Sequence, residues 1–529
     1  MRRLPLNADP ALFRDANQSR RHFIRAATAL SLLPLIQRPA MGIVLQNHTF
    51  RDYPFTLGVA SGDPLPDGVV LWTRLAPDPL HGGGMPNENI EVSWQMATDP
   101  LMKNVIANGA EIATPQFAHS VHVEVSGLEA SKVYYYRFKA GSELSPIGRT
   151  KTAPAYDSTP ERLRFAFASC QHYESGFFNA YFHMAGDDLD LVVHLGDYIY
   201  EGSAVNGAVR KHLGPEIESI EDYRNRHAQY KSDTDLQAAH AAFPWLVTWD
   251  DHEFDNNCAG DISEQINVNP AEFLIRRANA YQAYYEHMPL RKAAIPQGPL
   301  MQVYRGCLWG RLADFSVLDT RQYRSDQPCG DGNKPPCEES LSDKQTMLGT
   351  EQEAWLNKRL KQSPATWNIL AQQVMMGRAD RKAGDEIAFS MDQWPGYEVP
   401  RRRLMQYLHD QKISNPVVLT GDIHTNWVND LKIDFDDSKS PTVATEFVCT
   451  SISSGGDGTE NRTGSESLKS ENPFVKFYNS ERGYVRCEIT PERWQSDYQV
   501  VPYVSRKGSP QITRASFVVE RDAPGASPA

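Results

Sequence analysis

Four short apolar segments in the second part of the chain each end in side chains that can bind metal ions. The segments are 163–168, 189–195, 245–249 and 417–420. The residues that follow them are Ser169-Cys170-Gln171-His172, Gly196-Asp197-Tyr198-Ile199-Tyr200, Asp250-Asp251-His252-Glu253 and Gly421-Asp422-Ile423-His424. Reactive groups of α/β proteins gather at the carboxyl ends of strands. We therefore expect these four endings to share one site.

The donor types in this set suit hard cations. The candidate ligands are Cys170, Asp197, Tyr200, Asp251, Asp422 and His424. Carboxylates favour hard cations, a phenolate favours ferric iron, and a thiolate adds charge that stabilises a trivalent ion. Two metal ions bridged by one carboxylate can bind a phosphate ester and activate water for in-line attack. The pattern thus predicts a metal site that acts on phosphate esters.

Each ending has a simpler interpretation when it is taken alone. Gly196-Asp197 is typical of a turn, a lone Cys170 of a buried apolar residue, and a lone His424 of a hydrogen-bonded surface group. Asp250-Asp251-His252-Glu253 also suits the first turn of a helix, where acidic residues are favoured. The order and placement of all four endings together favour the metal site.

The elements before this region are short strands and turns. Segments 69–73, 90–96, 121–125 and 133–138 are rich in β-branched or aromatic residues, or alternate between apolar and polar ones. Leu128 precedes an aromatic strand, as is common near the tyrosine corner of fibronectin-like sandwiches. We predict an all-β fibronectin-like sandwich at 49–152, a linker at 152–160 and an α/β domain at 162–505.

The end of the chain, 506–529, is predicted to be partly disordered, because it is rich in Ala, Pro and Gly after Asp522. Residues 499–519 retain apolar side chains, so this stretch is also compatible with packing on the domain.

The first 45 residues are typical of an export signal. Arg20-Arg21 and Phe23-Ile24-Arg25 precede the apolar run 26–36, which is too short to span a bilayer. This order indicates a twin-arginine signal, with a chance basic pair before an amphipathic helix as the alternative. We expect export by the twin-arginine machinery to the periplasm or beyond. No later stretch is apolar enough for a membrane helix, so no stable membrane anchor is expected.

Composition adds limits on size and partners. A chain of 529 residues exceeds what one core usually serves, and its net charge of −12 argues against a nucleic-acid-binding surface. Of seven cysteines, Cys329 and Cys337 flank a Gly- and Pro-containing loop, which favours a local disulfide over two free thiols. The other cysteines outside the candidate site are expected to be buried small apolar residues: Cys258, Cys307, Cys449 and Cys487.

The four endings resemble the ligand motifs of the calcineurin-like metallophosphoesterases, with three departures. Cys170 stands for the first Asp, Asp251 for an Asn, and Asp422 for a His. These departures mark the PhoD-type alkaline phosphatases. Further segments are similar to that family: 58–64, 71–74 and 318–324, so that the similarity covers about 52–505.

The resemblance implies a fold of two mixed β-sheets flanked by helices, with Fe(3+) and Ca(2+) as cofactors. Cys170, Asp197 and Tyr200 should hold the iron, and Asp197 should bridge to calcium. Asp251 and Asp422 should bind calcium, while His424 either touches the iron or supports its ligands. This agrees with the chemistry, because carboxylates in place of a His and an amide harden the second site towards calcium.

The predicted activity is hydrolysis of phosphomonoesters, phosphodiesters or both by water activated at the metals, for phosphate scavenging. His252 is the candidate acid for the leaving group, against a histidine with no catalytic part. Asn257 and Arg321 are candidate substrate contacts, although a salt bridge is the commoner place for an arginine. Two alternatives stay open: a phospholipase D-type diesterase on lipid or teichoic-acid-like polymers, and a non-catalytic exported binding protein.

Overall fold

The computed structural model describes residues 44–46, 48–265, 267–462 and 464–529. Almost all of the predicted signal, 1–45, lies outside these residues. Its last two residues form β1 (Val44–Leu45), which pairs in parallel with β4 (Asn89–Ala97).

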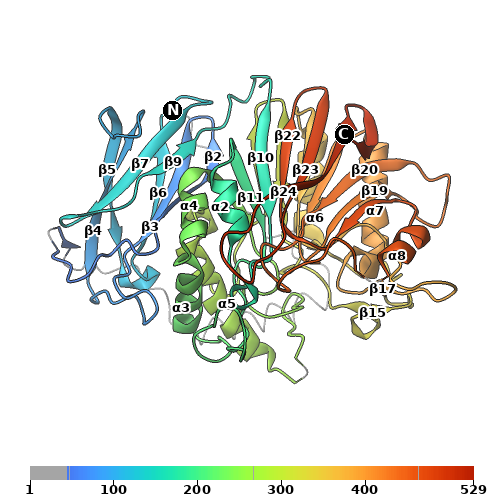
Figure 1. Ribbon diagram of the computed structural model, residues 1–529, viewed down its shortest axis with the longest axis horizontal. Helices are drawn as coiled ribbons and strands as arrows, with labels where there is room; N and C mark the ends of the chain where they lie inside the picture. The colour runs from blue at the N-terminus through green and yellow to red at the C-terminus, as the bar shows by residue number, and fades with distance from the viewer. Residues whose placement is uncertain (1–43, 47, 266, 463) are drawn as a thin grey trace, which may run out of the picture.

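A ten-stranded mixed sheet runs through the whole molecule (Figure 1). Its strands in spatial order are β25 (Ala523–Pro528), β24 (Ile512–Glu520), β23 (Arg493–Val501), β22 (Arg482–Ile489), β10 (Leu163–Ala168), β11 (Leu191–Leu195), β12 (Pro244–Thr248), β2 (Val59–Leu65), β3 (Gly68–Arg74) and β6 (Ser120–Ser126). The strands β10, β11, β12 and β2 are mutually parallel. Their carboxyl ends therefore lie at one edge of the sheet.

A second, seven-stranded mixed sheet packs against the first. Its order is β13 (Arg305–Trp309), β14 (Ala313–Val317), β16 (Trp367–Ala371), β18 (Pro416–Thr420), β20 (Thr442–Val448), β19 (Asn426–Lys432) and β21 (Val475–Asn479). The strands β14, β16, β18 and β20 are parallel. One buried apolar cluster contains side chains of both sheets, among them Phe165, Val193, Phe315 and Leu419.

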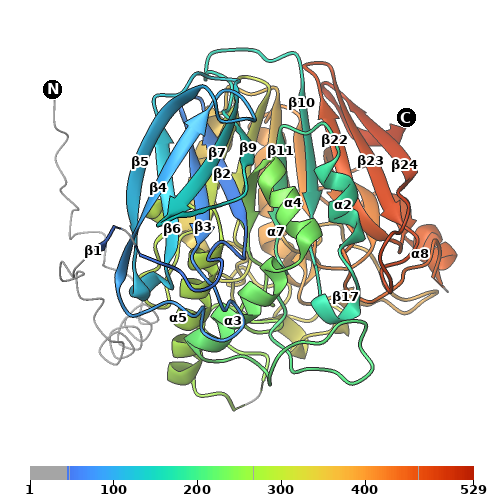
Figure 2. The ribbon, with the colours of Figure 1, turned by 60° about the vertical axis from the view of Figure 1, so that its left-hand side comes forward.

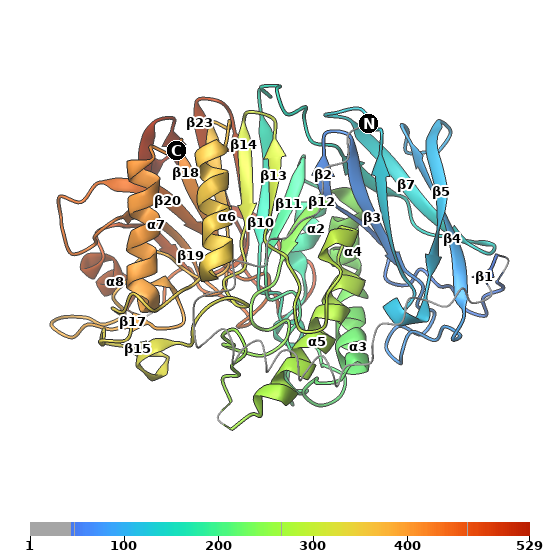
Figure 3. The ribbon, with the colours of Figure 1, turned by 180° about the vertical axis from the view of Figure 1, so that it is seen from behind.

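The apolar runs are continuous because both faces of these strands are buried. Phe165 and Phe167 of β10 belong to the core between the sheets, whereas Ala166 and Ala168 join a second core under the helices. That outer layer contains α2 (Asn179–Ala185), α3 (Ile220–Lys231), α4 (Thr234–Ala242) and α5 (Pro270–His287), which lie on the ten-stranded sheet (Figure 2). On the far side, α6 (Gly349–Gln362) and α7 (Glu398–Asp410) cover the seven-stranded sheet (Figure 3).

The N-terminal strands form two sheets around a shared core. A six-stranded sheet contains β1, β4, β5 (Val105–Ala113), β7 (Val133–Ala140), β8 (Glu143–Leu144) and β9 (Gly148–Lys151). Its apolar side chains pack on those of β2, β3 and β6. Those three strands continue the ten-stranded sheet, because β2 pairs with β12. The predicted boundary between a sandwich at 49–152 and a catalytic domain at 162–505 therefore cuts through one sheet.

The prediction of a partly disordered tail is wrong. β24 pairs with β23, and β25 returns along β24 as the last strand of the sheet. The Gly525 and Ala526 amides donate to Thr445 Oγ1 at 3.1 Å and Asp430 Oδ1 at 3.0 Å. Both acceptors belong to the seven-stranded sheet, so the small residues after Asp522 permit a close approach between the sheets.

Two loop features lie near the carboxyl edges of the sheets. β15 (Asn333–Lys334) pairs with β17 (Phe389–Ser390), and α8 (Ser465–Glu471) precedes β21. Cys329 and Cys337 form the predicted disulfide, and Cys258, Cys307, Cys449 and Cys487 are buried as expected.

Among the described residues, no helix is both long and apolar enough to cross a bilayer.

Candidate metal centre and active site

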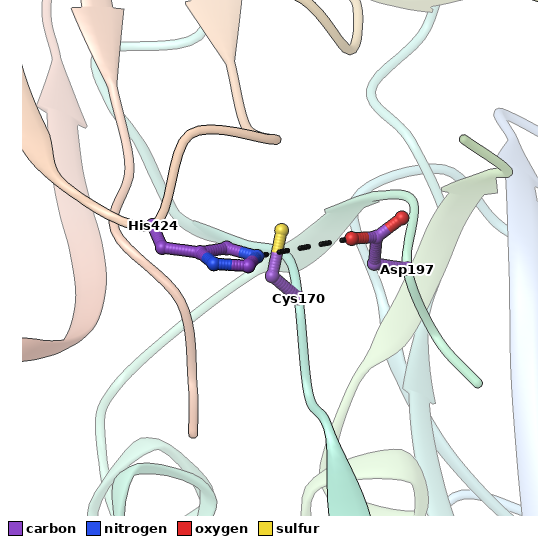
Figure 4. Close-up of side chains that lie close together, drawn as sticks. All are labelled: Cys170, Asp197 and His424. Carbon is purple, nitrogen blue, oxygen red and sulfur yellow. Dashed lines mark ion pairs between the residues drawn. The ribbon is translucent and has the colours of Figure 1, made fainter. Parts of the chain in front are cut away.

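The four predicted endings converge where the two sheets meet. Cys170, Asp197 and Asp251 follow the adjacent parallel strands β10, β11 and β12. Asp422 and His424 follow β18 of the other sheet. The Ser169 and Ser451 backbones form a bridge between the two edges, and Figure 4 shows the Cys170, Asp197 and His424 side chains turned toward one another.

Four of the candidate ligands have a left-handed backbone conformation. Cys170, Asp197, Asp422 and His424 have φ angles of 59°, 56°, 66° and 56°. Residues other than glycine rarely adopt positive φ angles, and such a conformation persists only where surrounding contacts hold it. Here the Cys170 amide donates to the Gly196 carbonyl at 3.1 Å, and the Arg482 guanidinium donates to the His424 carbonyl at 2.6 Å. The strained turns place the side chains of the strand ends in the shared site.

The first cluster contains sulfur, oxygen and nitrogen donors. One ligand atom each of Cys170, Asp197 and His424 lies within 4.8 Å of the others. The Tyr200 hydroxyl donates to Asp197 Oδ2 at 2.7 Å and lies 3.2 Å from His424 Nε2. Ser454 Oγ donates to the same hydroxyl at 2.7 Å. All three predicted iron ligands and His424 thus face one position.

The second cluster shares Asp197 with the first. Ligand atoms of Asp197, Asp251 and His252 also lie within 4.8 Å of one another. Asp251 Oδ1 and Asp422 Oδ1 each lie 3.7 Å from the same atom, Arg321 Nη2. Asp197 therefore stands between two groups of donors, as a bridging carboxylate must.

The site concentrates buried negative charge. Burial raises the pKa of Asp251, and it raises the pKa of Asp422 to about 7, with the neighbouring carboxylates adding to both shifts. Burial also raises the pKa of the Cys170 thiol, reinforced by Asp197. Asp197 Oδ1 and Asp251 Oδ1 are buried without a hydrogen-bond donor. Orphaned oxygens among crowded acids are the environment that a bound cation would satisfy, so the donor set fits metal ions.

Comparison with known proteins identifies the family of this chain. A family model described as "PhoD-like phosphatase" matches residues 165–498, and one for its N-terminal domain matches 41–154. The chain belongs to the PhoD-like phosphatase family. It is 51% identical over 522 residues to "Alkaline phosphatase D" of Bacillus subtilis (strain 168), covering 97% of this chain and 89% of that protein. A solved structure titled "Structure of PhoD" matches with a TM-score of 0.89 and 52% identity, covering 91% of this chain and 93% of that one.

The family membership and these relatives make the protein a phosphoric ester hydrolase. The predicted recognition of a PhoD-type enzyme is confirmed, and the predicted substrate class, a phosphate ester, follows from it.

In this PhoD-like phosphatase, His252 lies between an acidic and an aromatic side chain. Its Nδ1 lies 2.7 Å from Glu201 Oε2, and its ring lies 4.1 Å from the Tyr200 ring. Burial alone lowers the pKa of His252, but the Glu201, Asp197 and Asp251 carboxylates together raise it well above its ordinary value. No helix starts at His252, because residues 251–257 form successive turns and α5 begins only at Pro270. The acid role of His252 and the alternative without a catalytic part both stay predictions.

Arg321 does not lie at an accessible substrate position. It is fully buried and donates to Asp250 and to Asp392 Oδ1, the latter at 2.8 Å. The salt-bridge alternative therefore describes it better than the predicted substrate contact. Its positive charge offsets part of the negative charge of Asp251 and Asp422.

Asn257 is tied to the second group of donors. Its amide N–H donates to Asp251 Oδ2 at 2.7 Å, and its Nδ2 donates to Asp331 Oδ2 at 3.0 Å. Its side chain is half-buried at the rim, so a substrate contact stays a prediction.

Three supporting residues were missed from the sequence. Glu253 accepts hydrogen bonds from the amides of Asp197, Tyr198 and Asp250 and so fixes the turn after β11. Glu201 orients His252, and Gln393 Nε2 donates to Asp422 Oδ2 at 2.9 Å. Glu253 stands inside a recognised motif, but nothing in the local sequence of Gln393 points to a site.

Proposed function

We propose that the protein is an exported, metal-dependent phosphoesterase that uses Fe(3+) and Ca(2+) and acts on phosphomonoesters, phosphodiesters or both. The observation that carries this proposal is the pair of donor clusters that share Asp197. The Cys170 thiolate, the Tyr200 phenolate and the Asp197 carboxylate favour a trivalent ion. By contrast, the carboxylates of Asp197, Asp251 and Asp422 favour calcium.

The bound ions would neutralise the phosphoryl oxygens and lower the pKa of water at the site. Cys170, Asp197, Tyr200 and His424 would hold the iron, and Asp197, Asp251 and Asp422 the calcium. His252, oriented by Glu201, would donate its Nε2 proton to the leaving oxygen. Asn257 would contact the substrate at the rim.

The proposed location is outside the cytoplasm, with phosphate scavenging as the purpose. The pattern around Arg20-Arg21 supports export by the twin-arginine machinery. The Cys329–Cys337 disulfide supports an oxidising compartment. Cell fractionation of the natural chain beside an Arg20→Lys, Arg21→Lys double variant tests this, and equal export of both would refute it.

The activity is tested on bis-p-nitrophenyl phosphate with the purified protein before and after chelation. We expect turnover to disappear on chelation and to return with calcium. A parallel panel of p-nitrophenyl phosphate, a phospholipid and a teichoic-acid-like polymer distinguishes monoesterase, phospholipase and polymer diesterase activities. Full turnover in a metal-free sample would refute the metal dependence.

A further inference from the structure

Arg381 is a cation beside the candidate metal site. Burial lowers the pKa of its guanidinium, and Asp422, without forming an ion pair with it, offsets part of that shift. It lies in the segment between β16 and α7, and its guanidinium carbon lies 5.0 Å from the centre of the Trp427 ring. Among the described residues, its side chain makes a single hydrogen bond, a long one of 3.4 Å from Nη2 to Gln393 Oε1. Within the described part of the chain, no Asp or Glu oxygen forms an ion pair with it. A half-buried charge without a counter-ion is costly unless a ligand supplies one.

The other arginines near this segment are already neutralised. Arg378, three residues earlier, pairs with Asp436 at 2.7 Å. Arg321 and Arg324 both pair with Asp392. Arg381 differs from them because its charge remains available to a ligand.

The position of Arg381 is fixed relative to the metal ligands. Its amide donates to the Ala388 carbonyl at 2.8 Å, and Asp380 Oδ1 accepts from the amides of Lys382 and Ala388. Gln393 connects the arginine to Asp422, since its Oε1 faces Arg381 and its Nε2 donates to Asp422 Oδ2. The guanidinium is thus two hydrogen bonds away from a candidate metal ligand.

Positive charge extends along this side of the site. Arg381, Arg462 and Arg482 all act on the Tyr478 hydroxyl as positive neighbours, which offsets part of the rise in its pKa caused by burial. Among the described residues, Arg482 donates to carbonyl and hydroxyl oxygens alone: those of Gly456, His424, Thr450 and Ser451. The acidic donor clusters therefore face a cationic flank that suits an anion held by the metals.

We propose that Arg381 binds a non-bridging oxygen of the substrate phosphoryl group and is a substrate-binding residue of this enzyme. The inference rests on the proposed function, because it places the reacting phosphate at the donor clusters. A planar guanidinium donates two parallel N–H bonds to a phosphate, which an ammonium cannot do. Arg381 thereby takes the role that the sequence suggested for Arg321.

The test compares Arg381→Met and Arg381→Lys with the matched control Arg378→Met. The first substitution is expected to lower kcat/KM on bis-p-nitrophenyl phosphate about 10- to 100-fold, since it removes a charge-assisted hydrogen bond. It should weaken inhibition by inorganic phosphate by a similar factor. Arg381→Lys should lose less kcat/KM and less phosphate inhibition than Arg381→Met. In the control, where the substituted charge is already paired with Asp436, kcat/KM should change by less than about threefold.

Two readouts separate phosphate binding from support of the metal site. First, Arg381→Met must keep the metal content of the natural protein. Second, guanidinium ions added to a further variant, Arg381→Ala, should restore part of its turnover. Unchanged phosphate inhibition, or activity lost together with the metals, would overturn the inference. If the natural protein hydrolyses no ester, the proposed function fails by itself. Calorimetric binding of inorganic phosphate then decides on Arg381: a loss in Arg381→Met supports it, and equal binding overturns it.

Discussion

The proposed acid, His252, and its partner Glu201 offer the most discriminating test of the mechanism. The His252 ring is held by a 2.7 Å contact from Nδ1 to Glu201 Oε2, with only 21% of its side chain exposed. Glu201 also accepts from the Asn256 amide at 2.9 Å, so it is itself fixed. If Nε2 protonates the leaving oxygen, His252→Asn should lower kcat by about 10²- to 10⁴-fold on a substrate with a poor leaving group. The loss should be much smaller on p-nitrophenyl esters, whose leaving group needs little protonation.

The pH dependence of Glu201→Gln follows from the same contact. A charge-assisted hydrogen bond contributes about 1.5 to 3 kcal/mol, and about 1.4 kcal/mol corresponds to one pKa unit. The substitution should therefore lower the pKa of His252 by about one to two units. A general acid works below its pKa, so the alkaline limb of the kcat profile should move to lower pH by that amount. Bound cations would offset the Asp197 and Asp251 charges, which leaves Glu201 as the main cause of the raised pKa.

The assay measures kcat against pH for alkyl and p-nitrophenyl phosphate esters with the natural protein and both variants. Metal content is measured in parallel, because Asp251 is the neighbouring residue. Equal losses of His252→Asn on both leaving groups, with the metals retained, would refute the acid role. An unmoved alkaline limb in Glu201→Gln would refute the argument from the Glu201 contact.

Three further predictions concern the metals, the core and the tail. Asp197→Asn should lose both ions because it removes the shared carboxylate, and elemental analysis that finds one ion retained would contradict the bridge. Burial lowers the pKa of Lys231 from its ordinary value of 10.5 to about 7. Between these two pH values the unfolded state binds more protons than the folded state, so the free energy of unfolding should rise with pH. Lys231→Met should therefore raise the free energy of unfolding by roughly 3 to 5 kcal/mol near pH 6 and by little near pH 10. Urea unfolding at both pH values measures this, and an equal change in the midpoint at both would contradict the prediction. Truncation after Asp522 removes β25 and should lower Tm by several degrees in calorimetry, against an unchanged Tm if the tail were loose.

The sequence by itself determined the strands and the donor residues that follow them. The alternation of apolar and polar residues is weak in 163–168 and 191–195 because both faces of these strands are buried. Their short length and apolar character still identify them as strands. Cys170, Asp197, Tyr200 and Asp422 could be predicted as metal ligands because each lies shortly after such a segment. Local sequence also favoured the Cys329–Cys337 disulfide, since only eight positions separate the two residues.

Only the tertiary structure decided which sheet each segment joins and which charges are paired. Hydrogen bonds of β2 to β12 merge the N-terminal strands with the catalytic sheet, and the small residues after Asp522 gain order from acceptors on another sheet. Sequence motifs pointed to Arg321, whereas nothing in the sequence singled out Arg381. Arg321 is buried against Asp392, whereas Arg381 lies over Trp427 and forms no ion pair within the described part of the chain. Pairing of this kind depends on contacts between residues far apart in the chain, which the spacing of residues along it does not encode.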